Sequence, residues 1–230
     1  MTDDLQQRQL SVDGSVHVTD EKFNAASHLC GAIFALLGGI ILVVMASMAG
    51  KPWHIVSYAI YGMSLFTLFC ASTLHHSVMT SEKTIRILRI LDYNSIFLLI
   101  AGTYTPVCLV AVRNGLGWST LGVCWAVAIF GIILRSSIQS LPKWFTQTLY
   151  VSMGWLGVAI ALPFYEALGK TAFYQLIGGG LFYSVGSIIF IVEKPNPIPG
   201  KFGFHEIWHL FVLAGAGAHF AMMLEIMSLS

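Results

Sequence analysis

Two histidines four residues apart, His205 and His209, open an apolar run near the end of the chain. On a helix this spacing places both imidazoles on one face, one turn apart, where they can share a metal ion. The run continues to about residue 227 and is long enough to cross a bilayer. Because ionisable groups inside a membrane are costly, they indicate functional sites. The pair therefore predicts a metal site whose remaining ligands come from other segments.

The composition is that of an all-α integral membrane protein. Of 230 residues, 56% are hydrophobic and 10% are charged, whereas soluble domains average roughly 25% charged residues. The net charge of +1 and the absence of a basic cluster in the sequence argue against nucleic-acid binding. Residues 1–22 are polar and read as a short cytoplasmic tail, without the features of a cleavable signal peptide. Residues 23–230 are expected to form a single membrane domain.

Charged and turn-forming residues divide the membrane domain into seven apolar runs. Each run approaches the roughly 20 residues that a transmembrane helix needs. The runs cover about 25–49, 53–78, 90–112, 116–134, 145–164, 172–192 and 204–227. The sequence therefore predicts a seven-transmembrane helix bundle.

The distribution of Lys and Arg predicts the orientation of this bundle, because these residues accumulate on the cytoplasmic side. With the N-terminus cytoplasmic and the C-terminus outside, the outer loops carry only Lys51, Arg113 and Lys170. The inner side then carries Arg8, Lys22, Lys83, Arg86, Arg89, Arg135, Lys143, Lys194 and Lys201.

This orientation brings polar groups from three spans to one depth. Ser72 and His76 lie at the inner end of the second span, Asp92 lies near the inner start of the third, and the histidine pair begins the seventh. Ser72 and His76 are four residues apart and share a helix face. His75 points about 100° away from His76, so at most one of the two should face the site, and Ser72 favours His76.

His76, His205 and His209, with an open fourth position, match the ligand pattern of catalytic zinc. Zinc lowers the pKa of a bound water to about 7, so a zinc-bound hydroxide is available at neutral pH. Asp92 could accept a proton from that water, and Ser72 could hydrogen-bond the water or a substrate carbonyl. Taken singly, each group also has a structural interpretation.

In those structural interpretations, His76 makes a helix–helix hydrogen bond and Ser72 is a small interface residue. Asp92 pairs with Arg89 or caps the third span.

Other histidines are less readily placed. His219 lies about 15 Å deeper along the last span, so it should hydrogen-bond a neighbouring helix or line an internal cavity. His28 is a further inner-side candidate, and His17 and His54 read as ordinary tail and loop residues.

Residues 205–209 also match H-E-x-x-H, the zinc-protease motif in which Glu is the general base. We discount a protease because Glu225, a further ligand candidate on the same run, lies about 24 Å from His209. Membrane-embedded site-2 proteases use an Asp-Gly pair, whereas Tyr93 follows Asp92. Glu206 is instead expected to face the cytoplasmic headgroups.

The same polar residues carry a family resemblance. The blocks Ser72-Thr73-Leu74-His75-His76-Ser77, Leu91-Asp92-Tyr93, Gly102-Thr103-Tyr104-Thr105-Pro106, His205-Glu206-Ile207-Trp208-His209 and Ala218-His219-Phe220 resemble the hemolysin III family. This family is the bacterial branch of the progestin and adipoQ receptor superfamily, which is related to alkaline ceramidases. The resemblance implies seven helices in a bacterial inner membrane, with Zn²⁺ on His76, His205 and His209 and with Ser72 and Asp92 at the zinc-bound water.

The leading hypothesis is a zinc-dependent hydrolase of a lipid amide or ester, with a membrane lipid as its substrate. The alternative is a non-enzymatic sensor or regulator of the membrane in which zinc is structural. A protease, a channel and a haemolytic pore rank lower, because the sequence lacks a row of intramembrane carboxylates and an amphipathic insertion segment. The substrate, the protein partners and the oligomeric state stay open.

Overall fold

The computed structural model describes residues 20–78, 81–138 and 140–229, and every long element among them is a helix. The helices are α1 (Glu21–Met48), α2 (Pro52–Ser77), α3 (Glu82–Pro106), η1 (Val107–Ala111), α4 (Gly115–Ser137), α5 (Lys143–Trp155), η2 (Leu156–Ile160), α6 (Ala161–Val192) and α7 (Phe204–Ile226). The all-α fold class is therefore confirmed for the described residues.

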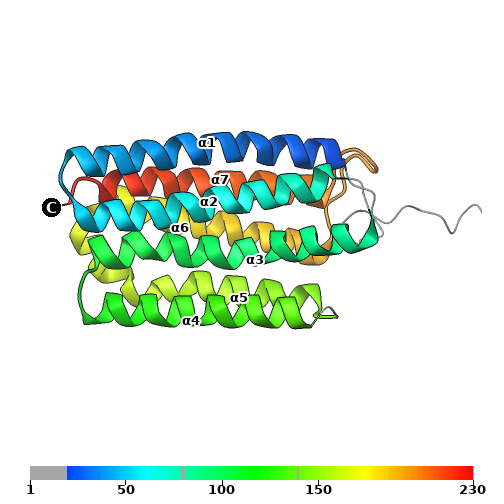
Figure 1. Ribbon diagram of the computed structural model, residues 1–230. Coiled ribbons are helices and arrows are strands. Elements are labelled where there is room, and N and C mark those ends of the chain that lie inside the picture. The colour runs from blue at the N-terminus through cyan, green and yellow to red at the C-terminus, as the bar shows by residue number, and fades with distance from the viewer. Residues whose placement is uncertain (1–19, 79–80, 139, 230) are drawn as a thin grey trace, which may run out of the picture.

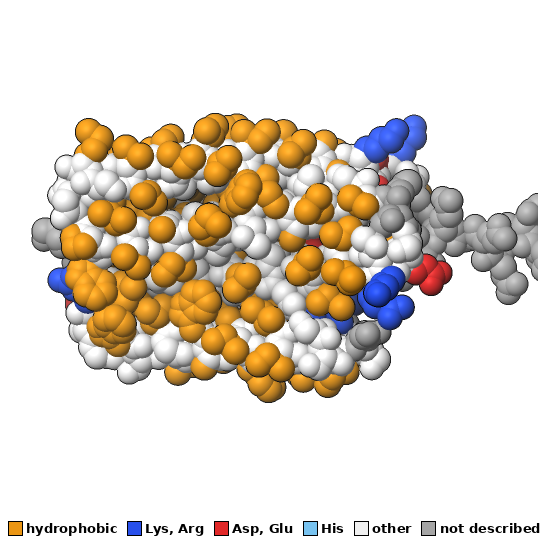
Figure 2. Space-filling model, viewed as in Figure 1, with side chains coloured by type: hydrophobic (Ala, Val, Ile, Leu, Met, Phe, Trp, Pro, Cys, Tyr) orange, Lys and Arg blue, Asp and Glu red, His pale blue; other side chains and the backbone are white. Residues whose placement is uncertain are grey.

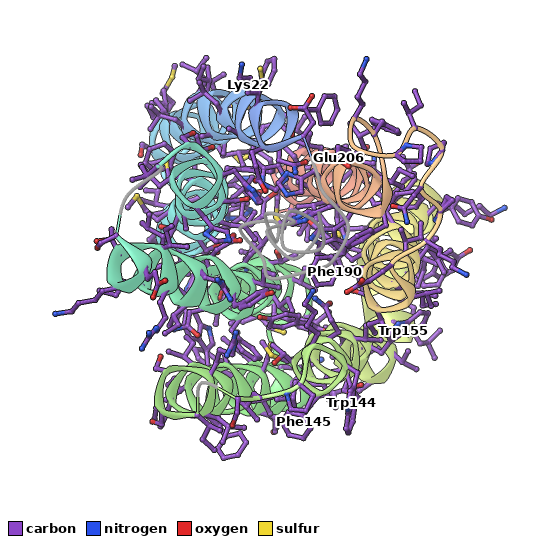
Figure 3. All side chains as sticks on the ribbon, turned by 90° about the vertical axis from the view of Figure 1, so that its right-hand side faces the viewer. Lys22, Trp144, Phe145, Trp155, Phe190 and Glu206 are labelled. Atoms are coloured by element: carbon purple, nitrogen blue, oxygen red, sulfur yellow. The ribbon has the colours of Figure 1, made fainter. Side chains whose placement is uncertain are left out.

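The long helices lie side by side as an elongated bundle (Figure 1). α1 packs against α2 and α7, α3 packs between α2 and α4, and α6 packs against α5 and α7. Seen from one end, the helices surround a central region toward which α2, α3 and α7 all turn a face (Figure 3). This arrangement brings the end of α2, the first half of α3 and the start of α7 together.

The surface of the bundle is apolar along its length, and Lys and Arg side chains gather at its ends (Figure 2). Large side chains such as Phe34 and Met48 are strongly exposed, which would be unfavourable in water over so wide a surface. Among the described residues, six helical segments are long and apolar enough to cross a membrane. The chain is therefore a multi-pass membrane protein.

One of these six segments spans Lys143–Val192 and covers both of the predicted runs 145–164 and 172–192. Within it, Gly169 has φ 75° and ψ −164°, outside the helical region, and lies between the two runs. Glycine adopts positive φ at no steric cost. A single non-helical residue thus stands where the sequence predicted a loop, and α5 and α6 are drawn as separate rods in Figure 1.

Several helices begin earlier than the apolar runs that mark them. α3 starts at Glu82, before the run that begins near residue 90, and there the Ser81 side chain accepts a hydrogen bond from Thr84 N. Likewise α1 starts at Glu21, capped by the Asp20 carboxylate. An apolar run marks residues suited to lipid, whereas a cap marks where the helix begins.

One end of the bundle is held by contacts between elements that are distant in sequence. Lys51, in the turn between α1 and α2, donates hydrogen bonds from Nζ to Met227 O at 2.9 Å and to Leu229 O. His54 is buried in α2, with Nε2 3.1 Å from Ile226 O, so its interpretation as a loop residue is wrong. The C-terminus of α7 is therefore held at the end of the bundle where α2 begins.

Candidate metal centre

Three buried histidines meet at the end of the bundle where α2 ends and α7 begins. His76 comes from the last turn of α2, and His205 and His209 come from the first two turns of α7. One ligand nitrogen from each lies within 4.8 Å of the others. The rings of His76 and His205 are 5.0 Å apart between centroids, and those of His76 and His209 are 4.9 Å apart. We call these three residues the histidine centre.

The donor chemistry of the histidine centre fits a zinc ion. His76 Nε2 and His209 Nδ1 are buried and make no hydrogen bond within the described part of the chain. Buried polar atoms are rarely left unpaired, so such nitrogens indicate a missing partner. Three imidazoles are a common ligand set for zinc, and a metal would satisfy the lone pairs that the protein leaves unused.

Asp92 and Ser72 lie beside the histidine centre. A second group of ligand atoms within 4.8 Å of one another comprises His75, His76 and Asp92. Ser72 and Asp92 line the same small cavity as His205 and His209. Because α3 begins at Glu82, Asp92 lies well inside the helix, and its interpretation as a cap is wrong.

His75 corrects a second expectation, that only one of the adjacent histidines could face the site. α2 packs between α1 and α3, so it has polar neighbours on more than one side. His76 approaches α7, while the ligand atom of His75 approaches that of Asp92 on α3. Two adjacent residues of α2 can therefore both face polar groups, because α2 has such groups on more than one side.

A small polar cavity of about 30 Å³ lies at this level. Its polar lining includes His28, Ser72, His75, Asp92, His205 and His209. His28, on α1, stacks on His209 with ring centroids 3.8 Å apart and an interplanar angle of 23°. α1 therefore contributes directly to the walls of the site.

Glu21 is a site residue that the sequence reasoning missed. Its Oε2 accepts a hydrogen bond from Nδ1 of His76, and the two side chains are 16% and 1% exposed. The signal that could have found it is the spacing of Glu21, Asn24 and His28, which places an acid, an amide and an imidazole on one face of a helix that otherwise faces lipid.

Glu206 corrects a further expectation. It was expected to face the headgroups, yet it is 0% exposed. Its Oε1 accepts hydrogen bonds from Asp20 N at 2.7 Å and Asn24 Nδ2 at 3.1 Å, and its Oε2 accepts from Gly203 N at 2.7 Å. In the end-on view Glu206 lies between α1 and α7 (Figure 3). Burial is tolerated because three donors satisfy the carboxylate.

A larger, mainly apolar cavity of about 120 Å³ continues from the polar one toward the other end of the bundle. The two cavities share Leu68, Ile96, Trp208 and Val212 in their walls. His219 lines the apolar cavity, and its Nε2 lies 3.2 Å from Leu176 O on α6. The two expected roles of His219, contact with a neighbouring helix and lining of an internal cavity, are both confirmed.

Comparison with known proteins gives consistent results. A family model described as haemolysin-III related matches residues 16–220. Hemolysin-3 of Bacillus cereus is 41% identical over 207 residues, covering 90% of this chain and 91% of that protein. The Hemolysin-3 homolog of Bacillus subtilis (strain 168) is 37% identical over 207 residues, covering 90% and 94%. Human monocyte to macrophage differentiation factor is 25% identical over 201 residues, covering 86% and 80%.

Proposed function

The chain belongs to the haemolysin III-related family, and from this premise we propose that it is a zinc-dependent hydrolase of a lipid amide or ester. The observation that carries the proposal is the histidine centre, in which three buried imidazoles converge beside a carboxylate and a hydroxyl, and His76 Nε2 and His209 Nδ1 make no hydrogen bond within the described residues. Its ligands would be His76, His205 and His209. We place it in the inner (plasma) membrane of a bacterium, and the two Bacillus relatives support a bacterial origin.

A bound zinc ion would act as a Lewis acid and lower the pKa of a water molecule to about 7. The residues of the chain have separate tasks around it. The Asp92 carboxylate would accept a proton and return it to the leaving group, as a general acid–base catalyst does. The Ser72 hydroxyl lines the same cavity as Asp92, where it would donate a hydrogen bond to this carboxylate and orient it.

The apolar cavity supports a lipid as the substrate. It adjoins the polar cavity through four shared residues, so a molecule with a polar headgroup and an apolar chain could occupy both. Because the chain of a membrane lipid already lies in hydrocarbon, the cavity would hold it through packing contacts rather than through its removal from water. The scissile amide or ester would then lie beside Asp92, and the chain would extend toward His219.

We also propose that the segment Lys143–Val192 crosses the membrane twice and reverses at Gly169. The segment has 50 residues, which would measure about 75 Å as one straight helix, far more than the roughly 30 Å of a hydrocarbon core. Two crossings would give seven in all, with the N-terminus cytoplasmic and the C-terminus outside. The excess of Lys and Arg on the inner side of this arrangement supports it.

A second candidate is a membrane sensor in which zinc is structural. The observation in its favour is that the ligands come from two helices distant in sequence, α2 and α7, which a metal would cross-link. The relatives' name supports a haemolytic pore only by analogy. A protease is disfavoured because each oxygen of Glu206 already accepts a hydrogen bond, leaving it poorly suited to act as a general base.

Purified protein with the Asp92→Asn substitution tests the hydrolase. Wild-type protein in detergent should contain about one zinc ion per chain by elemental analysis, and should cleave at least one member of a panel of lipid amides and esters. Asp92→Asn should keep the zinc and lower turnover by about 10²- to 10⁴-fold, because the proton acceptor is lost.

Different results would reject the proposal. Wild-type protein that retains zinc but cleaves no lipid in the panel, with Asp92→Asn leaving the cellular phenotype intact, would favour the sensor. Protein without metal, unaffected by His209→Ala, would reject both zinc functions.

A further inference from the structure

The start of α1 is tied to two other helices by hydrogen bonds from adjacent residues. Glu206 of α7 accepts from Asp20 N and Asn24 Nδ2. Between these two donors stands Glu21, whose carboxylate meets His76 of α2. We call residues 20–24 the α1 bracket, because it joins the first turn of α7 to the last turn of α2.

The chemistry of the contact between Glu21 and His76 specifies which imidazole nitrogen is available. An ionised carboxylate only accepts hydrogen bonds, so the shared proton lies on Nδ1 and the lone pair of the neutral ring lies on Nε2. Nε2 is the His76 nitrogen that is buried and makes no hydrogen bond in the described part of the chain. The Glu21 contact therefore presents His76 as a ligand through Nε2.

We propose that Glu21 is a positioning residue for the metal ligand His76, and that Glu206 acts through the α1 bracket to hold Glu21 in place. Metal-binding histidines commonly donate their second N–H to a carboxylate, which fixes the ring and makes it a better ligand. Glu206 supports the bracket by accepting hydrogen bonds from the residue before Glu21 and from Asn24. The proposal rests on the zinc site proposed above and assigns the Glu of H-E-x-x-H a structural task.

Glu206 is well placed for this task because it accepts hydrogen bonds from the start of α7 and from the start of α1. Its Oε2 holds Gly203 N at the start of α7, and its Oε1 holds the start of α1. The same side chain thus sets the position of the α1 bracket relative to the helix that carries His205 and His209. Displacing it would move Glu21 relative to His76, although Glu206 contacts neither of them in any hydrogen bond described for this chain.

The test measures zinc affinity of the full-length protein in detergent by competition with a chromophoric chelator. Glu21→Gln should weaken zinc binding about 10- to 100-fold, the range seen when such supporting carboxylates are removed. Glu82→Gln is the matched control, because Glu82 is also a first-turn acid but is exposed at the start of α3. It should leave the zinc affinity unchanged.

A double-mutant cycle separates support through Glu21 from an independent effect. The Glu206→Gln variant should also bind zinc less tightly than the wild type. The double variant with Glu21→Gln and Glu206→Gln should have no lower zinc affinity than the single variant whose affinity is lower. Losses that multiply in the double variant, or a Glu206→Gln protein with wild-type zinc affinity, would overturn the role of Glu206. If Glu206→Gln does not fold, Asn24→Ala, which removes only one of its donors, takes its place in the cycle.

Nitrogen NMR of ¹⁵N-histidine-labelled, metal-free protein makes the result independent of the proposed function. His76, assigned from the signal lost in His76→Gln, should be protonated at Nδ1 in the wild type and should lose this preference in Glu21→Gln. An unchanged His76 tautomer in folded Glu21→Gln protein would overturn the role of Glu21. A wild-type protein that binds no zinc yet shows this dependence would reject the zinc function and retain the Glu21–His76 contact.

Discussion

His75 and His76 are adjacent and both buried, yet they face different neighbours. His76 meets Glu21 through Nδ1 and lies within ligand distance of His205 and His209. His75 is grouped instead with Asp92 and His76. Loss of His76 and loss of His75 should therefore have different effects on zinc affinity, although the two residues share a helical turn.

Substitution of each histidine by glutamine tests this division. His76→Gln should remove most of the bound zinc, because it deletes one of three ligands. His75→Gln should keep zinc affinity within a few-fold of wild type, because it leaves the histidine centre intact. Zinc content after dialysis against a weak chelator measures both. Comparable loss from the two variants would assign His75 to the metal as well.

At this scale, sequence spacing was informative only for residues close together in the chain. His205 and His209, or Ser72 and His76, reveal their shared faces through a separation of four residues. Glu21 and His76 are 55 residues apart, and Asp20 and Glu206 are 186 apart. No periodicity links such pairs, so the α1 bracket becomes visible only when α1 and α7 are packed together.

The contact between α1 and α2 is among the closest in the bundle. A Cβ added to Gly62 would lie 3.0 Å from Gly39 Cα, tighter than most Cβ contacts in proteins, so the backbone of α1 would have to move. Small residues permit such an approach between membrane helices, where packing rather than water drives association. α1 must stay at this distance for its first turn to reach both His76 and Glu206.

Gly62→Ala should therefore destabilise the protein by about 1–3 kcal/mol, the usual range for overpacking. Gly122→Ala is the matched control, because Gly122 is helical and a Cβ there would meet nothing within 4 Å. The control should be neutral or slightly stabilising, since alanine favours helix over glycine. Thermal unfolding in detergent measures both, and equal stability of the two variants would contradict the assigned contact.

The helices themselves were predictable from hydropathy, and so were the starts of α2, α4 and α7, whereas the start of α3 was not. The apolar runs identify all the long helices described, because side chains that face lipid are apolar and can be recognised directly in the sequence. α3 nevertheless begins at Glu82, in a segment with Lys83, Arg86 and Arg89 that reads as a loop on hydropathy alone. The helical hydrogen bonds of α3 extend beyond the N-terminal end of its apolar run as far as Ser81, whose side chain caps the helix.

At the level of the whole molecule, the number of crossings decides on which side the C-terminus lies. In a chain with its four native cysteines replaced, Lys170→Cys should react with an impermeant thiol reagent from outside intact cells. Lys201→Cys should react only after the membrane is opened, and a C-terminal reporter should lie outside. A single crossing by residues 143–192 would reverse the Lys201 result and place the reporter in the cytoplasm.

The shared walls of the two cavities have a consequence for selectivity. His209 borders the polar cavity and His219 borders the apolar one, and their separation of ten positions on α7 corresponds to about 15 Å. If the bond to be cleaved is held at the metal, this distance would determine which length of acyl chain fits the apolar cavity. Short acyl chains would leave part of the apolar cavity unfilled, and chains longer than this distance would have to bend or protrude toward the bilayer.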